Sequence, residues 1–178
     1  MDLSSFRVGF GYDSHRLADG LPLVLGGVKI PSDRGCVAHS DGDAVIHALC
    51  DALLGAAALD DIGTHFPDTD PAYKGIDSTR LLQETVALLH TEGWRVNNAD
   101  ITIILEKPKL ADHKPLMRAR LSELMGVRTS AVCVKAKTNE KMGFVGAGEG
   151  VAVTAAVTIV RGQVSGDRFQ GTDACQIE

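Results

Sequence analysis

The chain has 178 residues, of which 44% are hydrophobic and 23% charged; this composition is typical of one globular domain and excludes wholesale disorder. Its 23 acidic and 18 basic residues leave a formal net charge of −5, without a block of like charge. Proteins that bind nucleic acid concentrate Lys and Arg or carry aromatic stacking platforms, so with only 4% aromatic residues we expect no nucleic-acid partner.

Strand and helix patterns alternate along the chain. Short alternating runs bounded by Gly or Pro predict strands, and longer amphipathic runs that end at Gly predict helices. The order predicts an α/β, or layered α+β, fold with helices packed against a sheet, in one domain over 1–178 with a core at about 7–161 and a polar, frayed tail at 162–178. In chain order we expect a strand at 7–11, a hairpin at 23–25 and 28–31, a helix at 41–59, a helix at 78–92, a strand at 99–106, a helix at 114–125, and strands at 132–137 and 150–161.

No stretch reaches the 18 or so apolar residues that a membrane span requires, and residues 1–7 lack the apolar core of a secretory signal. We therefore expect a soluble, cytoplasmic protein with no membrane partner, or alternatively the mature form of an organelle protein. The cysteines form no CxxC pair, so we expect reduced thiols and not a metal or redox motif. They are Cys36, Cys50, Cys133 and Cys175.

The last predicted strand indicates assembly. One of its faces carries Val and Ile and suits a core. A solvent-facing strand usually carries Lys or Glu, and the opposite face here does not, so we expect it to pack against another subunit. That opposite face consists of Ala152, Thr154, Ala156, Thr158 and Val160.

Asp13 and His15 stand on either side of Ser14, directly after the first predicted strand. Residues two apart in an extended chain point to the same side, so a carboxylate and an imidazole converge there. An isolated pair of this kind is more often a surface turn than a site. Both interpretations stay open from these residues alone.

The helix predicted at 41–59 is apolar almost all round, which indicates a buried helix, and His39, Ser40 or Asp41 can cap it. Polar residues recur on it at intervals of four, at Asp43, His47 and Asp51, and buried polar groups need partners or a metal. One interpretation is a structural hydrogen-bond ladder. The other is that His47 ligates a metal while an acidic neighbour orients its second nitrogen. Together with Asp13 and His15 this would give three ligands, the number at a catalytic zinc with an open fourth position.

Two loops follow with chemical side chains. Residues 60–71 are rich in Asp and Pro, which is typical of an ordinary loop, but carboxylates beside the polar helix would also suit a hydrated Mg²⁺ or Mn²⁺ or a sugar hydroxyl. Residues 135–150 combine Lys, Thr, Asn and many Gly, which suits a phosphate. Turn glycines are the alternative, and the segment is neither a P-loop nor a dinucleotide fingerprint.

Six segments in order resemble the 2-C-methyl-D-erythritol 2,4-cyclodiphosphate synthase family: RVGFGYDSHRL, LGGVKIP, AHSDGDAVIHALCDALLGAAALDDIG, FPDTDPAYKGIDS, KPKLADH and VKAKTNEKMGFVGAGEGVAV. The resemblance implies a mixed sheet with helices on one face, and a homotrimer whose sheets surround a threefold axis with active sites at the subunit interfaces. It implies cyclisation of 4-diphosphocytidyl-2-C-methyl-D-erythritol 2-phosphate with release of CMP, a step of non-mevalonate isoprenoid synthesis. The setting would be a bacterial cytoplasm, with the plastid stroma as the alternative.

The same resemblance implies roles for individual residues. Zn²⁺, or another divalent ion, would be bound by Asp13, His15 and His47, and a second ion, Mg²⁺ or Mn²⁺, by Glu140 with substrate oxygens. His39 and Thr138 would position the phosphates and stabilise the transition state. The substrate-binding residues would be Asp13, Ser14, His15, His39, Ser40 and Lys137 near the phosphates, Asp61, Ile62, Gly63, Phe66, Pro67, Asp68, Thr69 and Asp70 on the methylerythritol side, and Leu105, Pro108, Lys109, Leu110, Ala111, Thr138, Asn139, Glu140 and Phe144 on the cytidine diphosphate side.

Some positions depart from the family pattern. Ala147 stands where many members carry Arg, and Thr154 where some carry Glu; those charges are associated with a cavity on the threefold axis that holds an isoprenoid diphosphate. We therefore expect such regulation to be weak or absent. Lys137 and Asn139 also replace hydroxyl residues common in that loop. A trimeric isoprenoid diphosphate binder without catalysis and a structural zinc domain are the alternatives, although structural zinc is usually closed by four Cys or His ligands.

Overall fold

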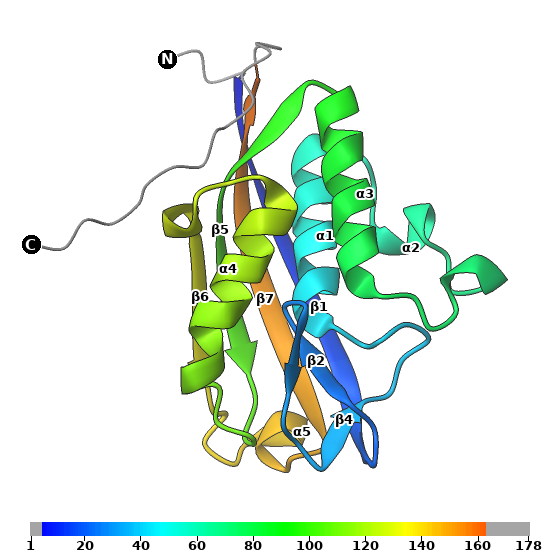
Figure 1. The fold of residues 1–178 in the computed structure, drawn as a ribbon, viewed down its shortest axis with the longest axis vertical. Coiled ribbons are helices and arrows are strands. Elements are labelled where there is room, and N and C mark those ends of the chain that lie inside the picture. Colours follow the sequence, from blue (N-terminus) through cyan, green and yellow to red (C-terminus); the bar gives the residue numbers. More distant parts are fainter. Residues whose placement is uncertain (1–4, 163–178) are drawn as a thin grey trace, which may run out of the picture.

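A computed structural model describes residues 5–162. It contains a five-stranded mixed sheet with strand order β4-β1-β7-β5-β6, and the long helices lie on one face of that sheet (Figure 1), which confirms the expected fold class. The predicted tail from 163 onward lies outside the described residues. In chain order the elements are β1 (Phe6–Asp19), β2 (Leu23–Leu25), β3 (Val28–Ile30), β4 (Arg34–Cys36), α1 (Ala44–Ala57), α2 (Ile62–His65), η2 (Pro71–Tyr73), α3 (Ser78–Thr91), β5 (Trp94–Ile104), η3 (Ala111–His113), α4 (Lys114–Met125), η4 (Thr129–Ala131), β6 (Val132–Lys137), α5 (Gly143–Gly146) and β7 (Gly150–Arg161).

The sheet is built around β7. Both β1 and β5 run antiparallel to it, β6 runs parallel to β5, and the short β4 pairs with the end of β1. Strands β2 and β3 form a separate hairpin. The predicted bounds of α4, β6 and β7 agree with the structure. The elements missed from the sequence are only three or four residues long, which is too short to show a hydrophobic period; they are β4, α2, η2, η3, η4 and α5.

Strand β1 is longer than predicted, and this corrects the placement of the first candidate pair. Asp13 and His15 lie inside the strand and not after it, because β1 pairs with β7 as far as Arg16. The three polar residues 13–15 on their own are typical of a turn. In the structure they lie in strand β1, where residues 13 and 15 are half-buried. The i, i+2 argument still holds, since the backbone is extended there.

Helix α1 approaches β1 unusually closely. A Cβ atom on Gly9 would lie 1.9 Å from the carbonyl oxygen of Ala52, and one on Gly11 would lie 2.0 Å from that of Ala48. The two glycines therefore let the helix backbone rest directly on the strand. Helix α1 is buried almost all round, as predicted, and its close approach brings His47 to the polar side chains of β1.

The face of the sheet that carries no helices is apolar and exposed over β1, whereas over β5 and β6 it carries an ion pair between Asp100 and Lys135. Phe6, Val8, Phe10 and Tyr12 point to it from β1 and expose 37%, 65%, 67% and 50% of their surface. In the β7 register, Val8, Phe10 and Tyr12 pair with residues of the Ala/Thr face, at 158, 156 and 154. A contiguous apolar surface of this kind is typical of a protein interface.

Two of the three described cysteines are small core residues. Cys36 and Cys50 are buried and Cys133 is exposed, and all three are free; Cys175 lies outside the described residues. Burial raises the pKa of the Cys36 and Cys50 thiols to about 12, so these two are not nucleophiles at neutral pH. Among the described helices, none has the length and apolar character needed to cross a membrane.

Candidate metal centre and substrate cavities

Three side chains converge where α1 lies on β1. Oδ2 of Asp13 lies 3.0 Å from Nε2 of His15 and 3.2 Å from Nδ1 of His47, and the two imidazole nitrogens are 3.1 Å apart. The three donor atoms thus form a nearly equilateral triangle. Metal–ligand distances of 2.0–2.1 Å in a tetrahedral zinc site place neighbouring donors about 3.3 Å apart. The donor set and spacing therefore fit one face of a tetrahedral divalent-metal site, with a fourth position open.

The electrostatics of this triangle favour a cation. Burial acts to raise the pKa of Asp13, but hydrogen bonds and charge interactions with His15 and His47 outweigh it and hold that pKa well below its usual range. Burial acts to lower the pKa of His47, yet the hydrogen bond to Asp13 and the nearby carboxylates raise it. Within residues 5–162 no other group of three such ligands comes together.

The polar stripe on α1 divides into two kinds of residue, so neither interpretation of it holds for all three members. Only His47 faces the metal site. Asp43 is fully buried, and its carboxylate accepts hydrogen bonds from four backbone amides, those of Gly26, Gly27, Val45 and Ile46, at 2.6–3.1 Å. Burial raises the pKa of Asp43, while the hydrogen bonds from the amides of Gly27, Gly26 and Ile46 oppose the rise. Asp43, and not His39, Ser40 or Asp41, is the N-cap of α1.

Asp51 also serves the backbone, because its Oδ1 accepts a bond of 2.8 Å from the amide of Ile62 at the start of α2. Neither Asp43 nor Asp51 therefore orients His47; both are structural hydrogen-bond acceptors, which is the other interpretation that the sequence left open. The second nitrogen of His47, Nε2, lies 3.0 Å from Oγ of Ser78 and 3.2 Å from Oγ of Ser40. Ser78 begins α3, and reasoning from the sequence missed it, since nothing local connects residue 78 to residue 47.

A cavity of about 330 Å³ opens beside the metal triad. Its wall includes His15, His47 and several predicted substrate-binding residues, namely His39, Ser40, Ile62, Gly63, Phe66 and Asp68. Asp61 caps α2 through the amide of Thr64, and Pro67, Thr69 and Asp70 lie in the adjoining loop without lining the cavity. The residues that sequence reasoning missed are Ala38, Tyr73, Ile76 and Leu81. Of these, Tyr73 packs edge-on against Phe66, with ring centroids 5.6 Å apart.

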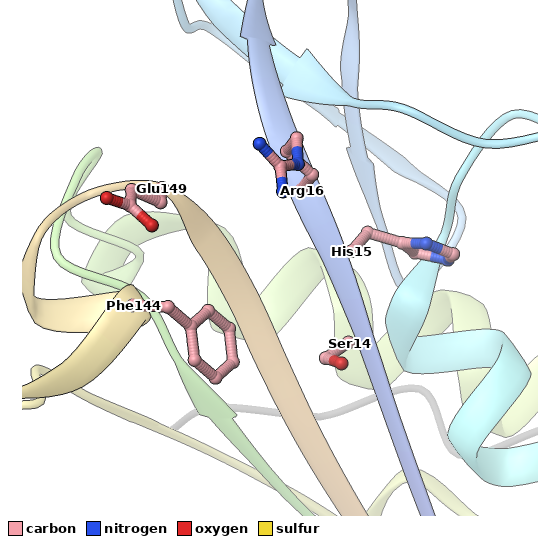
Figure 2. Close-up of a pocket in the computed structure, with 5 residues that line it drawn as sticks. All are labelled: Ser14, His15, Arg16, Phe144 and Glu149. Carbon is pink, nitrogen blue, oxygen red and sulfur yellow. The ribbon is translucent and has the colours of Figure 1, made fainter.

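Ser14 and Phe144 line a different pocket from the one beside the metal triad. Figure 2 shows Ser14 on the side of β1 nearer Phe144, while His15 points away toward α1. Ser14 and Phe144 line a pocket of about 290 Å³, whose wall also includes His15, Arg16 and Glu149. The alternation of side chains along β1 therefore separates Ser14 from the triad that Asp13 and His15 join.

A further cavity, of about 150 Å³, contains most of the predicted cytidine side. Asn139 and Glu140 adjoin it: the amide of Asn139 donates to Oε1 of Glu106 at 2.8 Å, and the hydroxyl of Thr138 donates to Oε1 of Glu140 at 2.5 Å. The triad and Thr138 thus line separate cavities of one chain. The residues that line this one are Leu105, Pro108, Lys109, Leu110, Ala111, Lys137 and Thr138, all predicted, and Lys114 and Ala136, which were not.

The sequence is similar to a known protein family and to named proteins of that family. The model of the YgbB family matches residues 6–160. A protein named 2-C-methyl-D-erythritol 2,4-cyclodiphosphate synthase from Gemmatimonas aurantiaca is 56% identical over 86% of this chain and 93% of its own length. One of the same name from Thioalkalivibrio sulfidiphilus is 56% identical over 88% and 98%.

Solved structures of similarly named proteins have a similar fold. A 2C-methyl-D-erythritol-2,4-cyclodiphosphate synthase in a CDP-bound form superposes with a TM-score of 0.80 at 42% identity, covering 86% of this chain and 99% of that one. A bifunctional IspDF from Campylobacter jejuni gives a TM-score of 0.85 at 39% identity, covering 88% of this chain and 42% of that larger chain. The likeness thus extends over nearly all described residues.

Proposed function

The chain belongs to the YgbB family, in which its curated relatives are 2-C-methyl-D-erythritol 2,4-cyclodiphosphate synthases, and from this membership we propose how its residues share the work of that reaction. The reaction is the metal-dependent cyclisation of 4-diphosphocytidyl-2-C-methyl-D-erythritol 2-phosphate to the 2,4-cyclodiphosphate, with release of CMP, in non-mevalonate isoprenoid synthesis. The observation that carries the assignment is the triangle of donor atoms from Asp13, His15 and His47 at the edge of a cavity that also contains His39.

In this proposal Asp13, His15 and His47 hold a divalent ion. The nature and spacing of the three donor atoms favour Zn²⁺. Glu140, with substrate oxygens, holds a second ion, Mg²⁺ or Mn²⁺, because a single exposed carboxylate suits a hydrated hard cation. Bound divalent ions supply Lewis-acid stabilisation of the charge on the diphosphate oxygens.

The substrate carries both reacting groups, so the protein's task is to fold it into an in-line geometry. An oxygen of the 2-phosphate forms a bond to the β-phosphorus while the bond from that phosphorus to the bridging oxygen breaks, and the electron pair of that bond leaves with CMP. A phosphate oxygen is ionised at neutral pH, so no general base is required. His39 and Ser40 line the cavity beside the triad, where their polar groups can position the phosphates. Ile62 and Phe66 enclose the methylerythritol side.

In this proposal the cytidine diphosphate part of the substrate binds in the cavity lined by Leu105, Lys137 and Thr138. The Thr138 hydroxyl can donate a hydrogen bond to a diphosphate oxygen there. Because this cavity is separate from the triad within one chain, we propose that the complete site forms between adjacent subunits of a homotrimer. The exposed apolar face of β1 and β7 supports this assembly. We further propose that 1–178 is one synthase domain and that it works in the cytoplasm.

Assembly gives a direct prediction. The wild-type protein should show three times the mass of one chain by light scattering at micromolar concentration, because the apolar face of β1 is otherwise left in water. Phe10→Glu, which puts a charge at the centre of that face, should shift the mass to that of a single chain. A monomeric wild type would end the trimer proposal.

The activity itself is tested by following CMP release from the cytidyl substrate. Release should stop when a chelator removes the metal and should return on addition of Zn²⁺ together with Mg²⁺ or Mn²⁺, because the proposed Lewis acids are absent from the chelated protein. The cyclic product should appear in equal amount. If no metal-dependent release occurs, the synthase assignment is wrong, and a binding module without catalysis becomes the better interpretation.

A further inference from the structure

The geometry around His47 points to two positioning residues for the metal site. We propose that Ser78 and Asp41 form a hydrogen-bonded pair that fixes the tautomer and orientation of His47, so that its Nδ1 lone pair is directed at the metal. This inference rests on the proposed metal-binding role of the triad. The argument follows from which atoms can donate a hydrogen.

The first step concerns the two nitrogens of His47. Nδ1 lies in the donor triangle, 3.2 Å from the Asp13 carboxylate and 3.1 Å from His15. A nitrogen that binds a metal needs a free lone pair, so the hydrogen of a neutral imidazole has to be on the other nitrogen, Nε2. That nitrogen therefore needs an acceptor, and the nearest is Oγ of Ser78 at 3.0 Å.

The second step concerns the hydroxyl of Ser78. A serine hydroxyl can donate or accept, so by itself it would fit either tautomer of His47. Here its hydrogen is committed, because Oγ of Ser78 donates to Oδ1 of Asp41 at 2.5 Å. Its lone pairs are then what remains for Nε2–H. Ser78 is fully buried, so water cannot substitute for either partner.

The third step concerns Asp41, whose role as an acceptor is set by backbone amides. The amide of Ser78 donates to Oδ2 at 3.1 Å, and the amide of Asp43 donates to Oδ1 at 3.2 Å. Backbone N–H groups can only donate, so they orient both carboxylate oxygens as acceptors. The direction of donation therefore runs from His47 Nε2–H to Ser78 Oγ–H to Asp41. A partner of this kind on the second nitrogen of a metal-binding histidine typically changes metal affinity about 10- to 100-fold.

Ser40 does not have the same effect. Its Oγ lies 3.2 Å from Nε2 of His47 and accepts from the amide of Gly42 at 3.1 Å. No acceptor in these contacts takes its hydroxyl hydrogen, so Ser40 can donate to an unprotonated Nε2 as readily as it can accept. Only the Ser78–Asp41 pair discriminates between the two tautomers.

The test uses Zn²⁺ alone and two variants. Ser78→Ala removes the acceptor. Asp41→Asn keeps the shape but leaves one side-chain oxygen for two backbone amides, those of Ser78 and Asp43. The carboxylate that commits the Ser78 hydroxyl hydrogen is then replaced by a weaker neutral acceptor or by an NH₂ donor. Both variants should weaken Zn²⁺ binding by about 10- to 100-fold in a chelator competition. The matched control is Ser122→Ala, which removes another buried hydroxyl, bonded to the Ala119 carbonyl on α4, and should leave Zn²⁺ affinity unchanged.

A second readout separates positioning from general destabilisation. In ¹⁵N-histidine-labelled, Zn²⁺-loaded protein, Nε2–H of His47 should give a slowly exchanging proton signal that is retained in Ser122→Ala and lost to fast exchange in both site variants. Unchanged affinity, or lost affinity with the proton signal intact, overturns the proposal. If Ser78→Ala does not fold, Asp41→Asn decides alone. Neither measurement uses the cytidyl substrate, so failure here is distinguishable from failure of the proposed function.

Discussion

His47→Ala should abolish CMP release and leave the protein without stoichiometric zinc. The reason is geometric: the triangle of Asp13, His15 and His47 loses one of its three donors, and two ligands on one strand cannot define a tetrahedral site. Spreading the binding energy of a four-ligand zinc site, about 10–16 kcal/mol, over its ligands gives about 3 kcal/mol for each, or on the order of 100-fold in affinity. Metal content after dialysis and single-turnover CMP release measure the two effects.

The control for this variant is His90→Ala. His90 is an exposed histidine in the last turn of α3, remote from the triad in the fold, and its removal should change neither zinc content nor turnover. Thermal unfolding of metal-free protein shows whether His47→Ala remains folded. Full activity in His47→Ala would falsify the ligand assignment, whereas loss of activity with stoichiometric zinc retained would limit His47 to a role in substrate binding.

Asp43→Ala should destabilise the fold more than any other single change at a helix cap here, by about 3–5 kcal/mol. Its carboxylate is the acceptor for four backbone amides, two at the start of α1 and two in the β2–β3 turn at Gly26 and Gly27. Removing it leaves those donors buried without a partner. Urea unfolding of metal-free protein, at one fixed protomer concentration, measures the loss.

A matched cap shows what is special about Asp43. Asp77 caps α3 through the single amide of Thr79 at 2.9 Å and is exposed, so Asp77→Ala should cost only about 1 kcal/mol. Asp43→Asn should fall between the two alanine variants, because one oxygen remains while the new NH₂ group faces an amide donor. Equal losses in Asp43→Ala and Asp77→Ala would show that the hairpin amides find other acceptors.

Much of this fold is predictable from local pattern. Strand β7 alternates between Gly150 and Gly162, and helix α4 begins beside Pro115 and ends before Gly126, so their bounds follow from the sequence. Strand β6 follows from its alternation of Val with Cys and Lys. The convergence of Asp13 with His15 follows from the two-residue period of a strand, and the burial of α1 from its Ala- and Leu-rich surface. His47 stands out because a polar residue in such a helix needs a partner.

The rest depends on contacts between distant segments, which periodicity does not reveal. Asp43 and Asp51 share a helical stripe with His47, yet their partners come from the β2–β3 turn and from α2. Spacing alone therefore could not decide between a structural role and the orientation of His47. Ser78 is 31 residues from His47 and looks like an ordinary helix start. The substrate roles of residues such as Ile62 and Leu110 come only from family resemblance, because apolar residues in loops and very short helices have no distinguishing local pattern.

Strand β1 has a different task on each of its faces. Its odd-numbered residues from Gly9 to His15 meet α1 and form the metal triangle, and its even-numbered residues from Phe6 to Tyr12 form the exposed apolar surface. Deleting or inserting one residue between Gly11 and Asp13 would therefore exchange the faces of one half of the strand relative to the other. Either the glycines would leave the helix or Asp13 and His15 would turn away from His47. The length of this segment is thus fixed more strictly than its composition, and natural variation within it should consist of substitutions and not of insertions or deletions.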